Sequence, residues 1–241
     1  SERQEYYANI LESLALEKLI YPCFCNRARL QSIASAPHVG EVAHRYDGHC
    51  RHIDEEEVKM LSAEKDPSLR LSIDSCDIEF TDRWQGVQHI HLEGELDDYV
   101  LRRGDGMYAY NLAVVLDDIA MGITEIIRGD DLLDTTGQQI YLYKTLQQCL
   151  HSKHIKVPSY GHAPLLIDSE GHRLSKRQKS ITIRELRDNQ WSANRIVGEL
   201  AIAGGLVKAN TLNNREISIS ELIEIDLNLP SLRQKTIEIK I

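Results

Sequence analysis

The stretch from position 122 to position 150 constrains the fold of this chain more than any other. GITEIIRG has the composition of a strand that ends at Arg128 and Gly129, and TTGQQIYLYKTLQQCL, which begins with threonine, has the spacing of a helix. A strand followed by a helix is the repeating unit of a parallel α/β sheet. The sequence therefore predicts an α/β fold.

Weaker patterns predict further elements in the first half of the chain. SERQEYYANILESLALEKLI carries apolar residues three and four positions apart, which predicts an amphipathic helix near the start. DEEEVKMLSAEKD predicts a short exposed helix. Between positions 69 and 103, β-type runs alternate with turn residues and place Val87, His89 and His91 on one face of a strand, exposed to solvent.

The second half is expected to begin with a loop bracketed by Pro158 and Pro164. A short strand, a turn at Glu170 and Gly171, and a basic loop follow. The remainder is predicted to be helical. Ser192 is suited to cap a helix over ANRIVGELAIAGG, and SISE, positions 218–221, matches a capping box.

Composition places the chain among ordinary globular proteins, with 241 residues, of which 42% are hydrophobic and 27% charged. No run approaches the roughly 18 to 20 apolar residues of a membrane span, and the start lacks the pattern of a signal peptide. These features predict a cytoplasmic protein without membrane attachment. The net charge of -9 argues against a basic coat over the whole surface, although it allows a local basic face for nucleic acid.

Five cysteines without a secretory signal favour reduced thiols or a metal site over a disulfide framework. Cys23 and Cys25 are one residue apart, and Cys50 lies in a second cluster, HRYDGHCR. Three thiolates on two short loops suit zinc, and ordinary ligand chemistry nominates a nearby histidine as the fourth donor. The candidates are His44, His49 and His52. Cys76 and Cys149 stand apart and are expected to be structural thiols.

The pentapeptide RLSKR, positions 173–177, places serine and lysine on a loop after a predicted strand. Such a pair suits the stabilisation of charge on a phosphoryl group in transfer. By itself the pentapeptide is also typical of an ordinary basic surface loop. Its meaning depends on the segments that accompany it.

Four segments together resemble one family. YPCFCNRARLQSIASAPH, YDGHCR, YAYNLAVVLDDIAMGITEIIRGDDLL and APLLIDSEGHRLSKR are similar in order and spacing to the catalytic half of class I glutamyl-tRNA synthetases, and more closely to their truncated paralogues, the glutamyl-Q tRNA(Asp) synthetases. The resemblance covers nearly the whole chain. It implies a Rossmann-like core helix over 1–19, a zinc-bearing acceptor-binding insertion over 20–98, the second half of the core over 99–180, and a helical stem-contact region over 181–241.

The resemblance also implies site residues. The zinc ligands become Cys23, Cys25, Tyr46 and Cys50, so that a tyrosine stands where ligand chemistry nominates a histidine. RLSKR matches the KMSKS loop, which makes Lys176 the catalytic, phosphate-contacting lysine. The ATP-binding residues implied are Arg173, Leu174, Ser175, Lys176 and Arg177.

Tyr110 and Arg128, 18 positions apart, have the spacing of two residues that bind glutamate in this family. Arg128 is suited to this role because a guanidinium can form two hydrogen bonds to one carboxylate. Without the resemblance, Tyr110 reads as a core or rim aromatic and Arg128 as a surface charge at the end of a strand.

The implied activity is ATP- and Mg²⁺-dependent activation of glutamate, followed by glutamyl transfer to the queuosine base at the wobble position of tRNA(Asp), by a monomer. The 64 residues after Arg177 are too few for the anticodon-binding region of an ordinary glutamyl-tRNA synthetase. Two alternatives remain: a catalytic fragment that charges tRNA(Glu), and a non-catalytic zinc-containing RNA-binding remnant. We expect the chain to lack the opening strand and HIGH-like element of the family's catalytic domain.

Overall fold

The computed structural model describes residues 3–26, 28–30, 46–174, 182–225, 227 and 229–239. The chain divides into two compact units. The first consists of Ser1–Phe80, His89–Thr124 and Asp134–Pro158, and the second of Thr81–Gln88, Glu125–Leu133 and Ser159–Ile241. Within the described residues, no helix is both long and apolar enough to cross a membrane.

The first unit opens with helix α1 (Gln4–Leu16), which buries one apolar face as its spacing predicts. A three-stranded antiparallel sheet of order β1-β2-β5 follows, built from β1 (Ile20–Cys23), β2 (Ser68–Leu71) and β5 (Tyr99–Arg102). Helix α3 (Glu55–Glu64) begins after Asp54, whose side chain accepts a hydrogen bond from the backbone N–H of Glu57. Strand β1 of this sheet ends at Cys23, the first of the three candidate zinc-binding cysteines.

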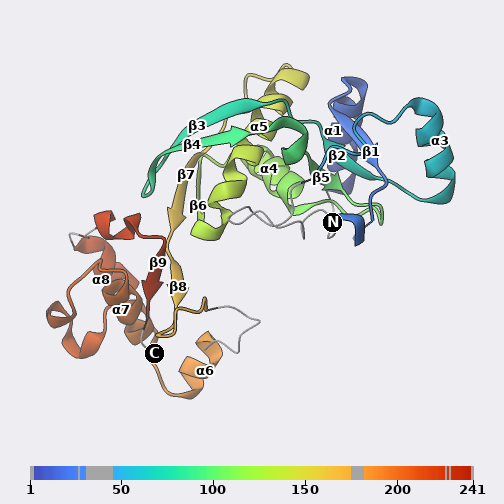
Figure 1. Ribbon diagram of the computed structural model, residues 1–241. Helices are drawn as coiled ribbons and strands as arrows, with labels where there is room; N and C mark the ends of the chain where they lie inside the picture. The colour runs from blue at the N-terminus through green and yellow to red at the C-terminus, as the bar shows by residue number, and fades with distance from the viewer. Residues whose placement is uncertain are drawn as a thin grey trace. The chain divides into compact units, whose positions relative to one another are not determined.

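Strands β3 (Cys76–Asp82) and β4 (Gly86–Leu92) form the long pair drawn in Figure 1, and the 3₁₀ turn η1 (Gly94–Asp97) follows them. The first unit also contains helix α4 (Tyr110–Met121) and nearly all of helix α5 (Leu133–Cys149). Helix α4 ends at Gly122, which adopts a left-handed conformation with φ of 66°. Val87, His89 and His91 share the exposed face of β4, as predicted.

The second unit is organised around β6 (Glu125–Gly129) and β7 (Ser159–Ala163), which pair in parallel with Arg128 opposite His162. The 3₁₀ turn η2 (Asp130–Leu132) follows β6. The order of the four-stranded sheet is β4-β3-β7-β6, and Asp82 at the end of β3 pairs with Tyr160. The expected strand at Arg128 and the α/β unit of strand, helix and parallel strand are therefore confirmed.

The rest of the second unit combines a small sheet with helices. Strands β8 (Leu165–Ile167) and β9 (Thr236–Glu238) pair in parallel. The helices are α6 (Ile183–Asp188), α7 (Ala193–Ala203) and α8 (Ile219–Glu224), with 3₁₀ turns η3 (Ala209–Thr211), η4 (Asn213–Arg215) and η5 (Leu229–Arg233). The predicted cap at Ser192 and the capping box at Ser218 are both present.

Two expectations about this half of the chain were wrong. The segment between Pro158 and Pro164 is not a loop, because it forms β7 and pairs along its length with β6. The two prolines flank the strand and so remove no hydrogen bond from it. The C-terminal remainder is not wholly helical either, since β9 pairs there with β8. The division into four domains remains a prediction.

Candidate metal centre and substrate-binding residues

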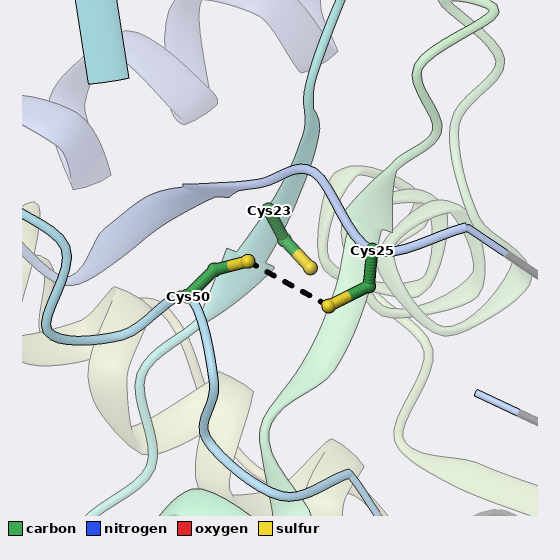
Figure 2. A group of neighbouring side chains, drawn as sticks. All are labelled: Cys23, Cys25 and Cys50. Carbon is green, nitrogen blue, oxygen red and sulfur yellow. Dashed lines mark hydrogen bonds between the residues drawn. The ribbon is translucent and has the colours of Figure 1, made fainter. Parts of the chain in front are cut away.

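Three cysteine thiols converge in the first unit. Cys23 is the last residue of β1, Cys25 follows it by two residues, and Cys50 lies in the turn after Gly48. The Sγ atoms of Cys25 and Cys50 are 3.6 Å apart, and all three Sγ atoms lie within 4.8 Å of one another. Figure 2 shows the three sulfurs pointing toward one another. Cys76 and Cys149 do not belong to this cluster.

Tyr46 brings an oxygen atom to the same cluster. Its side chain is buried, and its Oη lies 3.6 Å from Cys23 Sγ and accepts a hydrogen bond of 2.7 Å from the backbone N–H of Cys50. The His52 ring is exposed and contacts Glu95 instead. His49 is also exposed, and His44 lies outside the described residues. Among the described candidates, Tyr46 is therefore the one whose donor atom meets a cluster thiol.

Arg70, on β2, places a positive charge beside the thiols. The side chain is buried, its Nε lies 3.2 Å from Cys23 Sγ, and its guanidinium carbon lies 3.8 Å from the centre of the Tyr46 ring. Burial would raise the pKa of the Cys23 thiol, but the charge and hydrogen bond of Arg70, together with hydrogen bonds from Cys25 and Tyr46, outweigh burial and lower that pKa. Burial, together with the neighbouring thiols, raises the pKa of Cys25 to about 12.

The three sulfur atoms of the cluster are close enough together to bind one metal ion. Zinc–sulfur bonds of about 2.3 Å put two sulfur ligands of one ion about 3.8 Å apart. The separations of 3.6 Å between Cys25 and Cys50, and between Cys23 Sγ and Tyr46 Oη, are close to that value. Sulfur is a soft donor that suits zinc. The residues therefore fit a four-coordinate zinc ion with three sulfur donors and one oxygen donor.

Arg128 lies in a second cluster, in the second unit. Its Nε donates a hydrogen bond of 2.9 Å to His162 Nε2, and its Nη2 donates one of 3.3 Å to the carbonyl oxygen of Leu132. His162 Nδ1 lies 2.6 Å from Asp82 Oδ2. The Arg128 guanidinium carbon also lies 5.2 Å from the centre of the Tyr160 ring. The orientation of Arg128 is therefore set by neighbours on several sides.

The other expected substrate residues are only partly described. Tyr110 begins α4 in the first unit and is 57% exposed, so its pairing with Arg128 remains a prediction. Arg173 forms an ion pair of 2.9 Å with Asp131, and the backbone N–H of Leu174 donates to the carbonyl of Leu166. The rest of the expected ATP-binding loop, Ser175, Lys176 and Arg177, lies outside the described residues.

Sequence reasoning missed Arg70, His162 and Asp82. The sequence could have indicated Arg70, because it is a charged residue inside the apolar run LRLSI, and a buried charge is costly unless it has a partner. No such indication exists for His162 and Asp82, since they are 80 positions apart and belong to unremarkable short segments.

Comparison with known proteins agrees with this architecture. The family model described as "tRNA synthetases class I (E and Q), catalytic domain" matches residues 1–234. Proteins named glutamyl-Q tRNA(Asp) synthetase from Symbiobacterium thermophilum and Nitratidesulfovibrio vulgaris are 43% and 41% identical over 209 and 208 residues. Each alignment covers 86% of this chain and 62% of the relative, so the chain spans less than two thirds of the length of these relatives.

The crystal structure of glutamate–tRNA synthetase from Elizabethkingia anophelis matches the whole chain with a TM-score of 0.76 and 23% identity, and the match covers 52% of that protein. This likeness confirms the Rossmann-like α/β fold of a class I synthetase catalytic domain. Together with the family match over residues 1–234, it places the chain in the class I glutamyl- and glutaminyl-tRNA synthetase family.

Proposed function

We propose that the protein containing this chain activates glutamate with ATP and transfers the glutamyl group to the queuosine base of tRNA(Asp). The observation that carries this proposal is the identity of 43% and 41% to two proteins named glutamyl-Q tRNA(Asp) synthetase. The family match supports the broader part, a ligase that acts on glutamate, ATP and tRNA. The chain spans 62% of the length of these relatives, so the activity is proposed for the whole protein.

In the proposed first step, the glutamate α-carboxylate attacks the α-phosphorus of ATP and pyrophosphate leaves, which gives glutamyl-adenylate. Arg128 binds a carboxylate of glutamate through its guanidinium, and Tyr110 adds a hydroxyl contact. Lys176 offsets the charge that develops on the phosphate oxygens, and a bound Mg²⁺ ion would supply further positive charge there. In the second step the tRNA acceptor attacks the acyl carbon and AMP leaves.

We also propose that Cys23, Cys25, Tyr46 and Cys50 bind one structural zinc ion. The 3.6 Å contacts within the cluster and its burial support this assignment. Four protein ligands leave no open position for a substrate, which is typical of structural zinc. The ion would join the end of β1 to the turn that contains Tyr46 and Cys50, and its binding free energy would contribute to folding of that region.

Elemental analysis of the full-length protein tests the zinc proposal, with one zinc expected per chain. The double variant Cys23→Ser/Cys25→Ser should lose the metal because two of the four donors are removed. Cys149→Ser, outside the cluster, is the matched control and should retain it. Less than about 0.2 zinc per wild-type chain after expression in metal-replete medium, or full retention by the double variant, would refute the proposal.

The activity is tested with labelled glutamate, ATP and three RNAs: tRNA(Asp) that carries queuosine, tRNA(Asp) that lacks it, and tRNA(Glu). We expect the full-length protein to label only the first, in its anticodon loop. Transfer to the 3′ end of tRNA(Glu) would favour an ordinary glutamyl-tRNA synthetase. Failure to form adenylate under any condition would favour a non-catalytic RNA-binding protein.

A further inference from the structure

Asp82, His162 and Arg128 all belong to the second unit and form a chain of contacts across three neighbouring strands. Asp82 ends β3, His162 lies on β7 and Arg128 lies on β6. The side chains of Asp82 and His162 are completely buried. The strand register places Arg128 directly opposite His162, so the sheet itself brings the arginine and the imidazole together.

The chemistry of the three groups fixes the direction of each hydrogen bond. An arginine Nε can only donate, so His162 Nε2 must accept its 2.9 Å bond. The proton of the neutral imidazole is therefore on Nδ1, which donates to Asp82 Oδ2 at 2.6 Å. Asp82 thus selects the tautomer of His162 that can accept from Arg128.

Asp82 is itself held rigidly. Its Oδ1 accepts hydrogen bonds from the backbone N–H groups of Trp84 at 3.0 Å, Gln85 at 2.9 Å and His162 at 3.2 Å. Burial would raise the pKa of Asp82, but these N–H groups and the imidazole of His162 outweigh burial and hold that pKa below its usual value. The carboxylate is therefore a fixed, charged anchor for the imidazole.

A histidine that is buried only for packing does not need a hydrogen bond between its second ring nitrogen and a partly exposed arginine. Here the acceptor nitrogen of His162 holds Nε of Arg128, while the carbonyl of Leu132 holds Nη2. Arginine side chains have many rotamers, and this conformational entropy is lost when a flexible arginine binds a ligand. Fixing the guanidinium beforehand reduces that loss and favours binding.

We propose that His162, oriented by Asp82, is a positioning residue that holds Arg128 in the orientation that binds the glutamate carboxylate. This inference rests on the proposed function, in which Arg128 binds glutamate. His162 and Asp82 act through Arg128 and do not themselves touch the substrate. Their removal should weaken glutamate binding and leave ATP binding unchanged.

The test uses glutamate-dependent ATP–pyrophosphate exchange by the full-length protein. His162→Phe, which keeps a ring but removes the acceptor, should raise the KM for glutamate about 10- to 100-fold, the size expected for a lost hydrogen bond to a charged group. The KM for ATP should stay within about twofold of the wild-type value. His162→Gln, which retains an acceptor oxygen, should restore part of the loss. It also replaces His162→Phe in the test if that variant does not fold.

A double-mutant cycle separates positioning from general destabilisation. If His162 acts only through Arg128, adding His162→Phe to Arg128→Ala should cause little further loss, whereas independent effects would add. Unchanged KM for glutamate in His162→Phe, or full additivity with Arg128→Ala, would overturn the positioning role alone. No effect of Arg128→Ala, or no exchange by the wild-type protein, would overturn the proposed function and this inference with it.

Discussion

Arg70 offsets negative charge at the proposed zinc centre. Three thiolates around a divalent ion leave one excess negative charge, and an ionised Tyr46 would add a second. Arg70 meets both ligand types, through its contact with Cys23 Sγ and its position over the Tyr46 ring. A third contact, from Arg70 Nη1 to the carbonyl oxygen of Asp98 at 2.9 Å, holds the guanidinium in place. Partners of this kind, outside the ligand set, tune the affinity of metal sites.

Arg70→Gln should therefore weaken zinc binding about 10- to 100-fold, because the positive charge next to Cys23 is lost. Arg70→Lys should lie between this variant and the wild type, since lysine keeps the charge but not the planar fork. Competition with a chromophoric chelator measures the zinc Kd. Arg103→Gln, an exposed arginine paired with Asp105, is the control and should match the wild type. Equal Kd values for wild type and Arg70→Gln would contradict the prediction.

At the scale of elements, helix α7 approaches the backbone of Arg215 closely at Gly198. A Cβ atom at this glycine would lie 2.0 Å from the Arg215 carbonyl oxygen. On the next position of the helix, the buried Glu199 forms an ion pair with Arg215, and this partner lowers the pKa of Glu199. Helix α7 and the segment around η4 are thus joined at two adjacent positions, one by close packing and one by charge.

Gly198→Ala should destabilise the protein by about 1–3 kcal/mol, the usual cost of overpacking a close contact. The sign of the change in stability is informative, because a glycine-to-alanine substitution in an unobstructed helix stabilises the protein by up to about 1 kcal/mol. Denaturant unfolding followed by circular dichroism measures the effect. Asn194→Ala, at an exposed position of the same helix, should stay within about 0.5 kcal/mol of the wild type. A Gly198→Ala protein as stable as the wild type would show that the contact relaxes freely.

At the scale of the whole molecule, the chain consists of two compact units, and the thiol cluster lies entirely in the first. The cluster connects residues 25 positions apart, from Cys25 to Cys50. A metal ion there would stabilise by restricting the unfolded chain and by joining β1 to the turn around Tyr46. Its stabilising effect should therefore be strongest in the surrounding segments.

Removal of zinc by a chelator should increase hydrogen exchange at residues 20–26 and 46–53 well before it affects the second unit. The physical reason is that only the first unit contains the proposed ligands. Mass spectrometry of peptides after timed exchange measures protection in both units. The Cys23→Ser/Cys25→Ser variant should show no further change when the chelator is added. A uniform loss of protection in both units of the wild type would argue against a local role for the metal.

The sequence by itself determined the elements whose signals are local. The spacing that forms α1, the strand that ends at Arg128, and the capping box at Ser218 each depend on residues a few positions apart, and all were predicted correctly. The pattern of three cysteines likewise indicated a cluster, and their thiols do meet. These features can be predicted because residues a few positions apart in the sequence determine the local backbone structure.

Only the tertiary structure decided what depends on residues far apart in the chain. The segment between Pro158 and Pro164 becomes β7 because β6 is there to pair with it. Tyr46 Oη meets the thiol of Cys23, and Arg70 packs over the Tyr46 ring. The His52 ring is exposed and contacts Glu95 instead. Asp82 and His162, 80 positions apart, meet because β3 and β7 are neighbours. Strand pairing and burial create these contacts, and neither leaves a periodic signal in the sequence.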